Sequence, residues 1–143
     1  MNAQEQRNKF WNYFDNYLRK QGNPFYVCHT KGGINQAAGN INTINPMDMQ
    51  TICCEFKYRE QAVVVQVYIN GNVLLYEQLF SMKNVLEKEL GFPVQWINSG
   101  TRSDSVRRIQ KTFYIYDEYS YPEVIEQAFP CILSFIKVFG KYI

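Results

Sequence analysis

The residues able to act as nucleophiles or soft metal ligands are few in this chain. Its single histidine, His29, follows Cys28, and the other cysteines are Cys53, Cys54 and Cys131. Successive residues of a strand face opposite ways, so Cys28 and His29 would not meet, although a nucleophile needs its base within hydrogen-bonding reach. Zinc sites need spaced pairs of cysteine or histidine, and the chain has no Cys-x-x-Cys pair. We therefore expect free, mostly buried thiols, no metal site and no cofactor.

A carboxylate and a lysine lie two residues apart in Glu55-Phe56-Lys57, with Asp48 upstream. On a strand this spacing places Glu55 and Lys57 on one face. The triplet resembles the acidic-x-Lys half-motif of restriction-endonuclease-like nucleases, in which carboxylates hold a divalent metal ion and the lysine helps to position the attacking water. The alternative is a solvated strand face whose charges pair across strands. A metal-dependent nuclease using Asp48, Glu55 and Lys57 is thus one hypothesis, and we favour a non-enzymatic protein over it.

Four basic residues lie between positions 102 and 111 and are followed by aromatic residues, and two more lie at positions 57 and 59. The candidates for nucleic-acid binding are Lys57, Arg59, Arg102, Arg107, Arg108 and Lys111. Basic and aromatic side chains together bind single strands through phosphate contacts and base stacking. Lys111 falls between Ile109 and Phe113 on the expected apolar face, which indicates a bulge or an edge strand. The alternative is an edge strand that charge protects from aggregation, with no ligand.

The composition describes one globular domain, residues 1–143. With 46% hydrophobic residues the chain is too apolar for intrinsic disorder. A net charge of +2 does not by itself indicate a nucleic-acid or membrane partner. The first nine residues are polar and unlike a secretory signal, and no apolar run reaches the roughly 20 residues of a membrane helix. We therefore expect a cytoplasmic protein without a membrane partner.

Three helices are predicted from apolar residues at helical spacing. The first carries Phe10, Phe14 and Leu18 on one face and stops at Gly22. The second spans 75–90, begins after a possible cap at Asn72 and ends at Gly91. The third follows a capping box formed by Ser120 and Glu123, and Pro130 is expected to kink or divide it.

About five strands are predicted, over 24–30, 51–59, 62–69, 94–97 and 106–116. In the second, Ile52, Cys54, Phe56 and Tyr58 form an apolar face opposite Cys53, Glu55, Lys57 and Arg59. The segment 31–46 is rich in glycine and asparagine, which predicts a loop with at most a short edge strand over 40–44. It lacks the glycine spacing of a phosphate-binding loop.

Strands grouped in hairpins predict an α+β fold with a mainly antiparallel sheet, in the order α-β-β-β-α-β-β-α. We expect the helices to pack largely on one face of this sheet.

The chain resembles the bacterial and archaeal family called domain of unknown function 4268. The similarity covers most of the chain, and the residues that carry it are Phe10-Trp11, Phe14, Tyr17-Leu18, Gly22, Arg59, Val65-Gln66-Val67-Tyr68-Ile69, Leu79, Leu86-Glu87-Lys88-Glu89-Leu90-Gly91, Trp96, Arg108-Ile109 and Lys137-Val138-Phe139. Members often form the C-terminal part of proteins whose N-terminal part resembles a nuclease. The resemblance implies a companion role in nucleic-acid processing or defence.

Three functions are compatible with these patterns. The first is an accessory or binding domain that associates with nucleic acid through the six basic residues. The second is a protein-interaction or homo-oligomerisation module that uses aromatic surface or an open sheet edge. The third is the metal-dependent nuclease.

Overall fold

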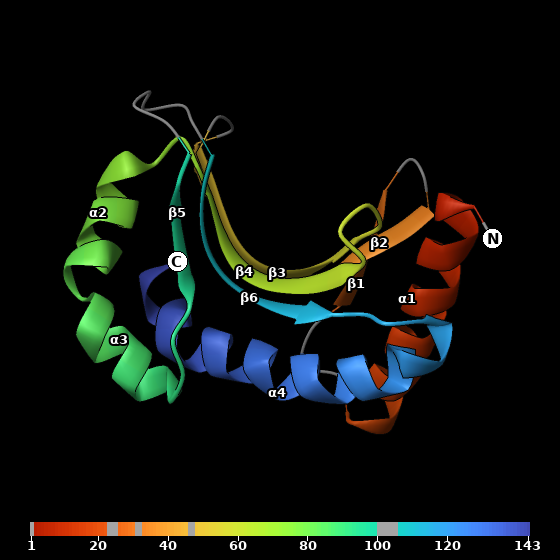
Figure 1. Cartoon of the computed structure of the whole chain (residues 1–143). Coiled ribbons are helices and arrows are strands. Elements are labelled where there is room, and N and C mark those ends of the chain that lie inside the picture. Colours follow the sequence, from red (N-terminus) through yellow and green to blue (C-terminus); the bar gives the residue numbers. More distant parts are fainter. Residues whose placement is uncertain (1, 23–25, 31–32, 46–47, 100–105) are drawn as a thin grey trace.

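The fold is α+β, with one antiparallel sheet whose helices pack on a single face (Figure 1). The computed structural model describes residues 2–22, 26–30, 33–45, 48–99 and 106–143; for 26–30, 33–45, 48–49 and 118 it describes the backbone alone. In these residues the strand order is β1-β2-β3-β4-β6-β5. The strands are β1 (Tyr26–Thr30), β2 (Gly33–Asn45), β3 (Asp48–Lys57), β4 (Ala62–Asn70), β5 (Gln95–Asn98) and β6 (Val106–Tyr114).

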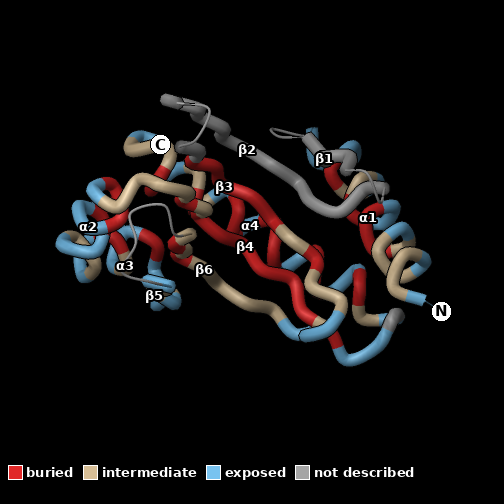
Figure 2. Tube along the Cα trace, turned by 90° about the horizontal axis from the view of Figure 1, so that it is seen from above, coloured by how far each residue is buried: buried red, intermediate tan, exposed pale blue. Residues whose placement is uncertain are grey.

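The sheet is strongly curved, and the helices lie on its convex side and at its ends. They are α1 (Ala3–Lys20), α2 (Val73–Ser81), α3 (Lys83–Leu90) and α4 (Tyr121–Phe139), with short 3-10 turns η1 (Glu118–Ser120) and η2 (Gly140–Tyr142). Figure 1 shows α4 running along the convex face, α1 beside β1 and β2, and α2 and α3 beside β5. Seen from above in Figure 2, the concave side of β3, β4 and β6 has no described helix over it.

The core lies between the convex face and the helices. Val63, Val65, Val67 and Ile69 of β4 are fully buried there. Their neighbours on β3 are Ile52, Cys54 and Phe56, which form the predicted apolar face. From α1, the side chains of Phe10, Trp11, Phe14 and Leu18 have no exposed surface.

The strand count differs from the prediction because 33–45 forms β2 and not a loop. This strand pairs with β1 on one side and with β3 on the other. Backbone hydrogen bonds to two neighbours compensate for the low strand propensity of glycine and asparagine. Breaks in register between Ala38 and Ile41, and between Thr43 and Asn45, accommodate the irregular sequence.

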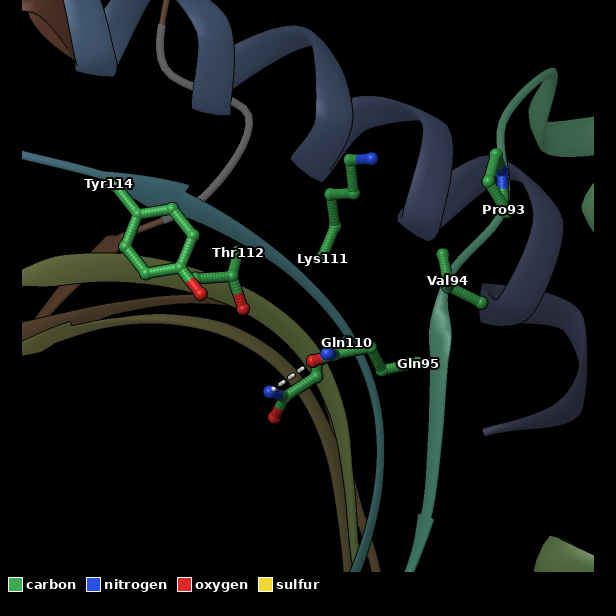
Figure 3. Close-up of a pocket in the computed structure, with 7 residues that line it drawn as sticks. All are labelled: Pro93, Val94, Gln95, Gln110, Lys111, Thr112 and Tyr114. Carbon is green, nitrogen blue, oxygen red and sulfur yellow. Dashed lines mark hydrogen bonds between the residues drawn. The ribbon is translucent and has the colours of Figure 1, made fainter. Parts of the chain in front are cut away.

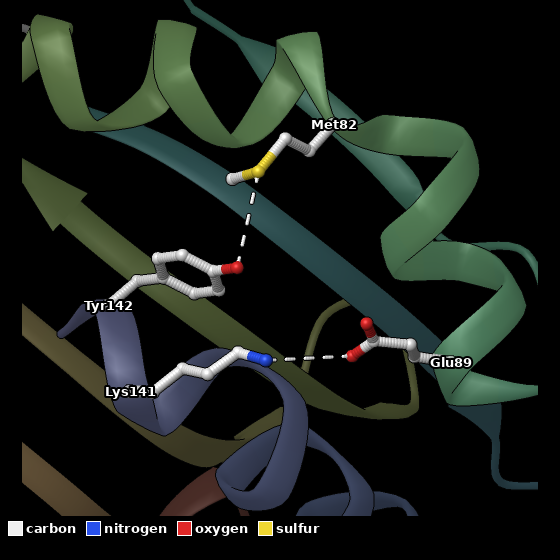
Figure 4. Close-up of polar contacts among 4 residues, drawn as sticks. All are labelled: Met82, Glu89, Lys141 and Tyr142. Atoms are coloured by element: carbon white, nitrogen blue, oxygen red, sulfur yellow. Dashed lines mark hydrogen bonds and ion pairs between the residues drawn. The ribbon is translucent and has the colours of Figure 1, made fainter.

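The helix count also differs, because the segment predicted as one helix over 75–90 is divided at Met82. The hydroxyl of Ser81 donates a 2.6 Å hydrogen bond to the carbonyl of Gln78, a contact that competes with regular helix geometry. Leu75, Leu79, Leu86 and Leu90 are nevertheless buried, so the predicted apolar face is correct. Residues of η2 contact both sides of this division (Figure 4). The ammonium group of Lys141 lies 3.8 Å from the carboxylate of Glu89 in α3, and the hydroxyl of Tyr142 donates to the sulfur of Met82.

The ends of the helices test the predicted caps. Gly91 has the left-handed φ of 87° expected of a helix stop. The predicted capping box at Ser120 is wrong, since the Ser120 side chain makes no cap and instead donates to the carbonyl of Asp117. Pro130 does not divide α4, which is assigned as one helix. None of the described helices has the length and apolarity needed to cross a membrane.

The cap at Asn72 is confirmed, because its Oδ1 accepts a 3.1 Å hydrogen bond from the N–H of Leu75. Asn72→Ala removes this acceptor and leaves a helix N–H unpaired. We expect the free energy of unfolding to fall by about 1 kcal/mol. Urea denaturation measures the loss, with Asn84→Ala on the exposed surface of α3 as the matched control. Equal losses in the two variants would show that the cap contributes nothing.

Candidate binding site on the open face of the sheet

The concave face of the sheet, here called the open face, carries polar side chains at its centre. The strand register aligns Cys53, Gln66, Gln110 and Gln95 in one row across β3, β4, β6 and β5. Residues that lie directly opposite on paired strands share a face of the sheet. The three glutamines, which we call the glutamine row, therefore project from the same surface although they are distant in the sequence.

The glutamine row is held by hydrogen bonds between side chains. Gln66 Nε2 donates to Glu55 Oε2 at 3.0 Å and to Cys53 Sγ at 3.4 Å. Gln110 Nε2 donates to Gln95 Oε1 at 3.0 Å. Figure 3 shows this pair, with Thr112 and Tyr114 on the same side of β6 and Lys111 pointing the other way, toward α4. These hydrogen bonds therefore hold the side-chain N–H groups of Gln66 and Gln110 in one direction each.

The carbonyl oxygens of the same amides have no partner. Gln66 is only 1% exposed, yet its Oε1 accepts no hydrogen bond, and neither does the Oε1 of Gln110. In the neighbouring row, Thr51 Oγ1 and Arg108 Nε are also unpaired. Buried polar atoms are almost always hydrogen-bonded in folded proteins. Two acceptors, a hydroxyl and a guanidinium N–H therefore lie unsatisfied in the floor of this concave surface, and the exposed amide of Gln95 and the half-buried amide of Gln110 are the part of the row that a polar ligand can reach.

Positive charge on the open face lies at its two ends. Arg108 stands over the ring of Tyr68, 5.6 Å from its centroid, next to the glutamine row. Lys57 aligns with Ala62 and Tyr114 at the opposite end. Six residues of β6 separate these positions, which corresponds to about 20 Å along a strand. The two cations flank the amides and are too far apart to share one phosphate.

Two of the other basic candidates, Arg107 and Lys111, lie on the opposite face of the sheet. Arg107 is 2% exposed and donates from Nε to Asn98 Oδ1 on the helix-covered face, so it is a buried residue and not an exposed contact. Lys111 lies on that same face, with its ammonium group 5.6 Å from the Phe92 ring centroid. Arg59 is exposed in the turn after Lys57, and Arg102 lies outside the described residues.

Only part of the proposed nuclease triad is brought together. Glu55 and Lys57 share the open face, as their spacing predicts. Asp48 begins β3 and lies seven residues from Glu55, about 23 Å along an extended strand. In the part of the chain that the structure describes, no three acidic, cysteine or histidine side chains form a group able to hold a metal ion.

The cysteines whose side chains are described are buried, as expected. Cys53 and Cys54 face opposite sides of β3, with Cys54 in the core. Burial, reinforced by the neighbouring Cys53, raises the pKa of the Cys54 thiol well above its ordinary value. The side chains of Cys28 and His29 lie outside the described part of the structure, so the expectation that they do not meet stays untested.

The glutamine row is not predicted from the sequence, although one signal for it is present. Gln66 is the polar residue at the middle of an otherwise apolar strand, and the alternation of β4 assigns it to the face opposite Val65 and Val67. Its alignment with Gln110 and Gln95 depends on the order of strands in the sheet, which local patterns do not contain.

A protein-family model matches nearly the whole chain. The family described as Domain of unknown function (DUF4268) matches residues 6–143. The chain belongs to this family. The DUF4268 match runs from α1 to the end of η2 and therefore includes every strand of the sheet and the whole glutamine row. Comparisons with curated proteins and with solved structures gave no match.

Proposed function

We propose that this DUF4268 protein is an accessory binding domain that holds single-stranded nucleic acid on the open face of its sheet. The observation that carries the proposal is the glutamine row, in which the buried carbonyl oxygens of Gln66 and Gln110 lack partners on a concave surface that has no described helix over it. Amide side chains present both donors and acceptors, which match the edges of unpaired bases. An open antiparallel sheet face is a known platform for single strands.

The charges and aromatic rings of the open face support an extended ligand. Arg108 and Lys57 lie at the two ends of the surface, where they can contact different phosphates of one extended strand. Tyr114 is 64% exposed on the same face and offers a ring on which a base can stack. Stacking on an aromatic residue contributes about 1–3 kcal/mol per base.

The proposal predicts salt-dependent binding that requires Lys57. Fluorescence anisotropy with labelled single-stranded and double-stranded DNA and RNA, at about 50 and 200 mM salt, measures the affinity. We expect single strands to bind more tightly and Lys57→Glu to weaken their binding about tenfold, with a smaller dependence on salt, because a phosphate contact is lost. Lys137→Glu makes the same charge change on the exposed surface of α4, across the sheet, and is expected to bind as the parent does.

Two results would contradict the proposal. One is the absence of binding to any of these nucleic acids at low salt. The other is an equal loss in Lys57→Glu and Lys137→Glu, since this would show a general charge effect without a defined surface. Circular dichroism of both variants establishes that they remain folded.

A further inference from the structure

Among the described residues, no strand pairs with the outer edge of β6 over its last four residues. β5 pairs with β6 only from Arg107 to Gln110, whereas β6 continues to Tyr114 beside β4 alone. The chain before β5 turns away because the N–H of Val94 donates a 2.8 Å hydrogen bond to the carboxylate of Glu87, and because Pro93 has no N–H to offer. This leaves a gap, here called the notch, between 111–114 and 92–94.

A cavity lies on each side of the notch. The first, of about 290 Å³, is on the open-face side and is lined by Pro93, Val94, Gln95, Gln110, Lys111, Thr112 and Tyr114 (Figure 3). The second, of about 270 Å³, is lined by Phe92, Phe113, Pro130 and Cys131, together with Lys111, Gln127 and Ser134. Successive side chains of an added strand point to opposite faces. A strand in the notch would therefore place one side chain in the polar cavity and the next in the apolar one.

The notch is closed at one end. Gln95 and Gln110 are joined by their side chains and by strand pairing, so a chain that enters beside Tyr114 must stop at this pair. Lys111 stands at the closed end, lines both cavities and reaches across to the Phe92 ring at 5.6 Å. None of the described residues that line the two cavities is acidic. The end of the notch therefore favours a negatively charged chain end over a positively charged one.

We propose that the notch binds the C-terminal peptide of a partner protein as an added strand. The peptide runs antiparallel to β6 and in line with β5, and its terminal carboxylate pairs with Lys111. The last residue faces the same side as Lys111, so it is apolar and enters the cavity formed by Phe92, Phe113 and Pro130. The residue before it is polar and lies beside Gln95, Gln110 and Thr112. Main-chain hydrogen bonds supply affinity and the two cavities supply specificity, as in other strand additions.

The test uses fluorescein-labelled hexapeptides that end in Ser-Leu, Ser-Val, Ser-Phe or Ser-Asp, each as a free acid and as an amide. We expect at least one of the three apolar free acids to bind, with at least tenfold weaker binding for its amide and for the Ser-Asp peptide. Lys111→Gln is expected to lower the affinity at least tenfold. Ser134→Phe, which fills the apolar cavity from the surface of α4, is expected to do the same, and Lys137→Gln on the same helix is the control.

The proposal is overturned if no free acid binds at 1 mM peptide, or if acid and amide bind equally. It is also overturned if the protein dimerises in sedimentation experiments and Ser134→Phe abolishes the dimer, because the edge would then be occupied by a second copy. Lys111 and Ser134 lie on the helix-covered side, away from the open face, so failure here leaves the nucleic-acid proposal intact.

Discussion

Phe10→Ala is expected to lower the free energy of unfolding by about 4 kcal/mol, a large part of the 5–15 kcal/mol typical of a domain. Phe10 is fully buried, and its ring joins three elements of the fold. It stacks on Phe56 of β3 with centroids 4.9 Å apart, and it meets Trp11 of α1 at 5.0 Å and Tyr121 of α4 at 5.5 Å, edge to face. Removing the ring leaves a cavity where α1, the sheet and α4 meet.

Urea denaturation followed by circular dichroism measures this loss. The midpoint should fall while the slope of the transition stays constant, since the surface exposed on unfolding hardly changes. Phe10→Leu keeps most of the apolar volume and is expected to cost less than half as much. Tyr116→Ala removes an aromatic ring that is 92% exposed and should change the free energy by less than about 0.5 kcal/mol. A loss below 1.5 kcal/mol for Phe10→Ala would show that this aromatic cluster is not central to stability.

The parts of the fold that the sequence predicts are those decided by local chemistry. The faces of α1, β3 and β4 follow from residue spacing, because each apolar stripe must be buried whatever its partner. Asn72 and Gly91 mark helix ends through their own side chain or backbone, and both are confirmed. Ser120 is the exception, because its hydroxyl, which suits a cap, instead donates to the carbonyl of Asp117.

The parts that the sequence does not predict depend on partners distant in the chain. β2 has the composition of a loop, and only pairing with both β1 and β3 makes it a strand. The candidate site is not predicted for the same reason, since Gln66, Gln95 and Gln110 come from strands that are separated in the sequence by two helices or by residues 99–105. Arg107 shows the converse error: a basic residue beside Arg108 in the sequence faces the opposite side of the sheet and is buried.

Cys131 is expected to react with iodoacetamide at pH 8 about 1,000 times more slowly in the folded protein than in guanidinium chloride. The thiol is 5% exposed on α4, and burial raises its pKa from 9.0 to about 12, although Lys111 opposes the shift. Only the thiolate is alkylated, and at pH 8 its fraction is about one tenth for a pKa of 9 but about one ten-thousandth for a pKa of 12. The rate in the folded protein should therefore rise tenfold per pH unit, and the difference from the unfolded chain should close toward pH 12.

The sign of this shift also affects stability, because the folded protein keeps the Cys131 proton where the unfolded chain has lost it. The contribution of Cys131 to the free energy of unfolding is complete below pH 9 and decreases as the pH rises from 9 toward 12.

Mass spectrometry of the peptide that contains Cys131 measures alkylation, with Ser81→Cys as an exposed thiol in the same folded protein. Lys111→Gln removes the opposing charge and should slow the reaction of Cys131 further. Alkylation of Cys131 within tenfold of the Ser81→Cys thiol at pH 8 would mean that water reaches α4 through the apolar cavity beside β6.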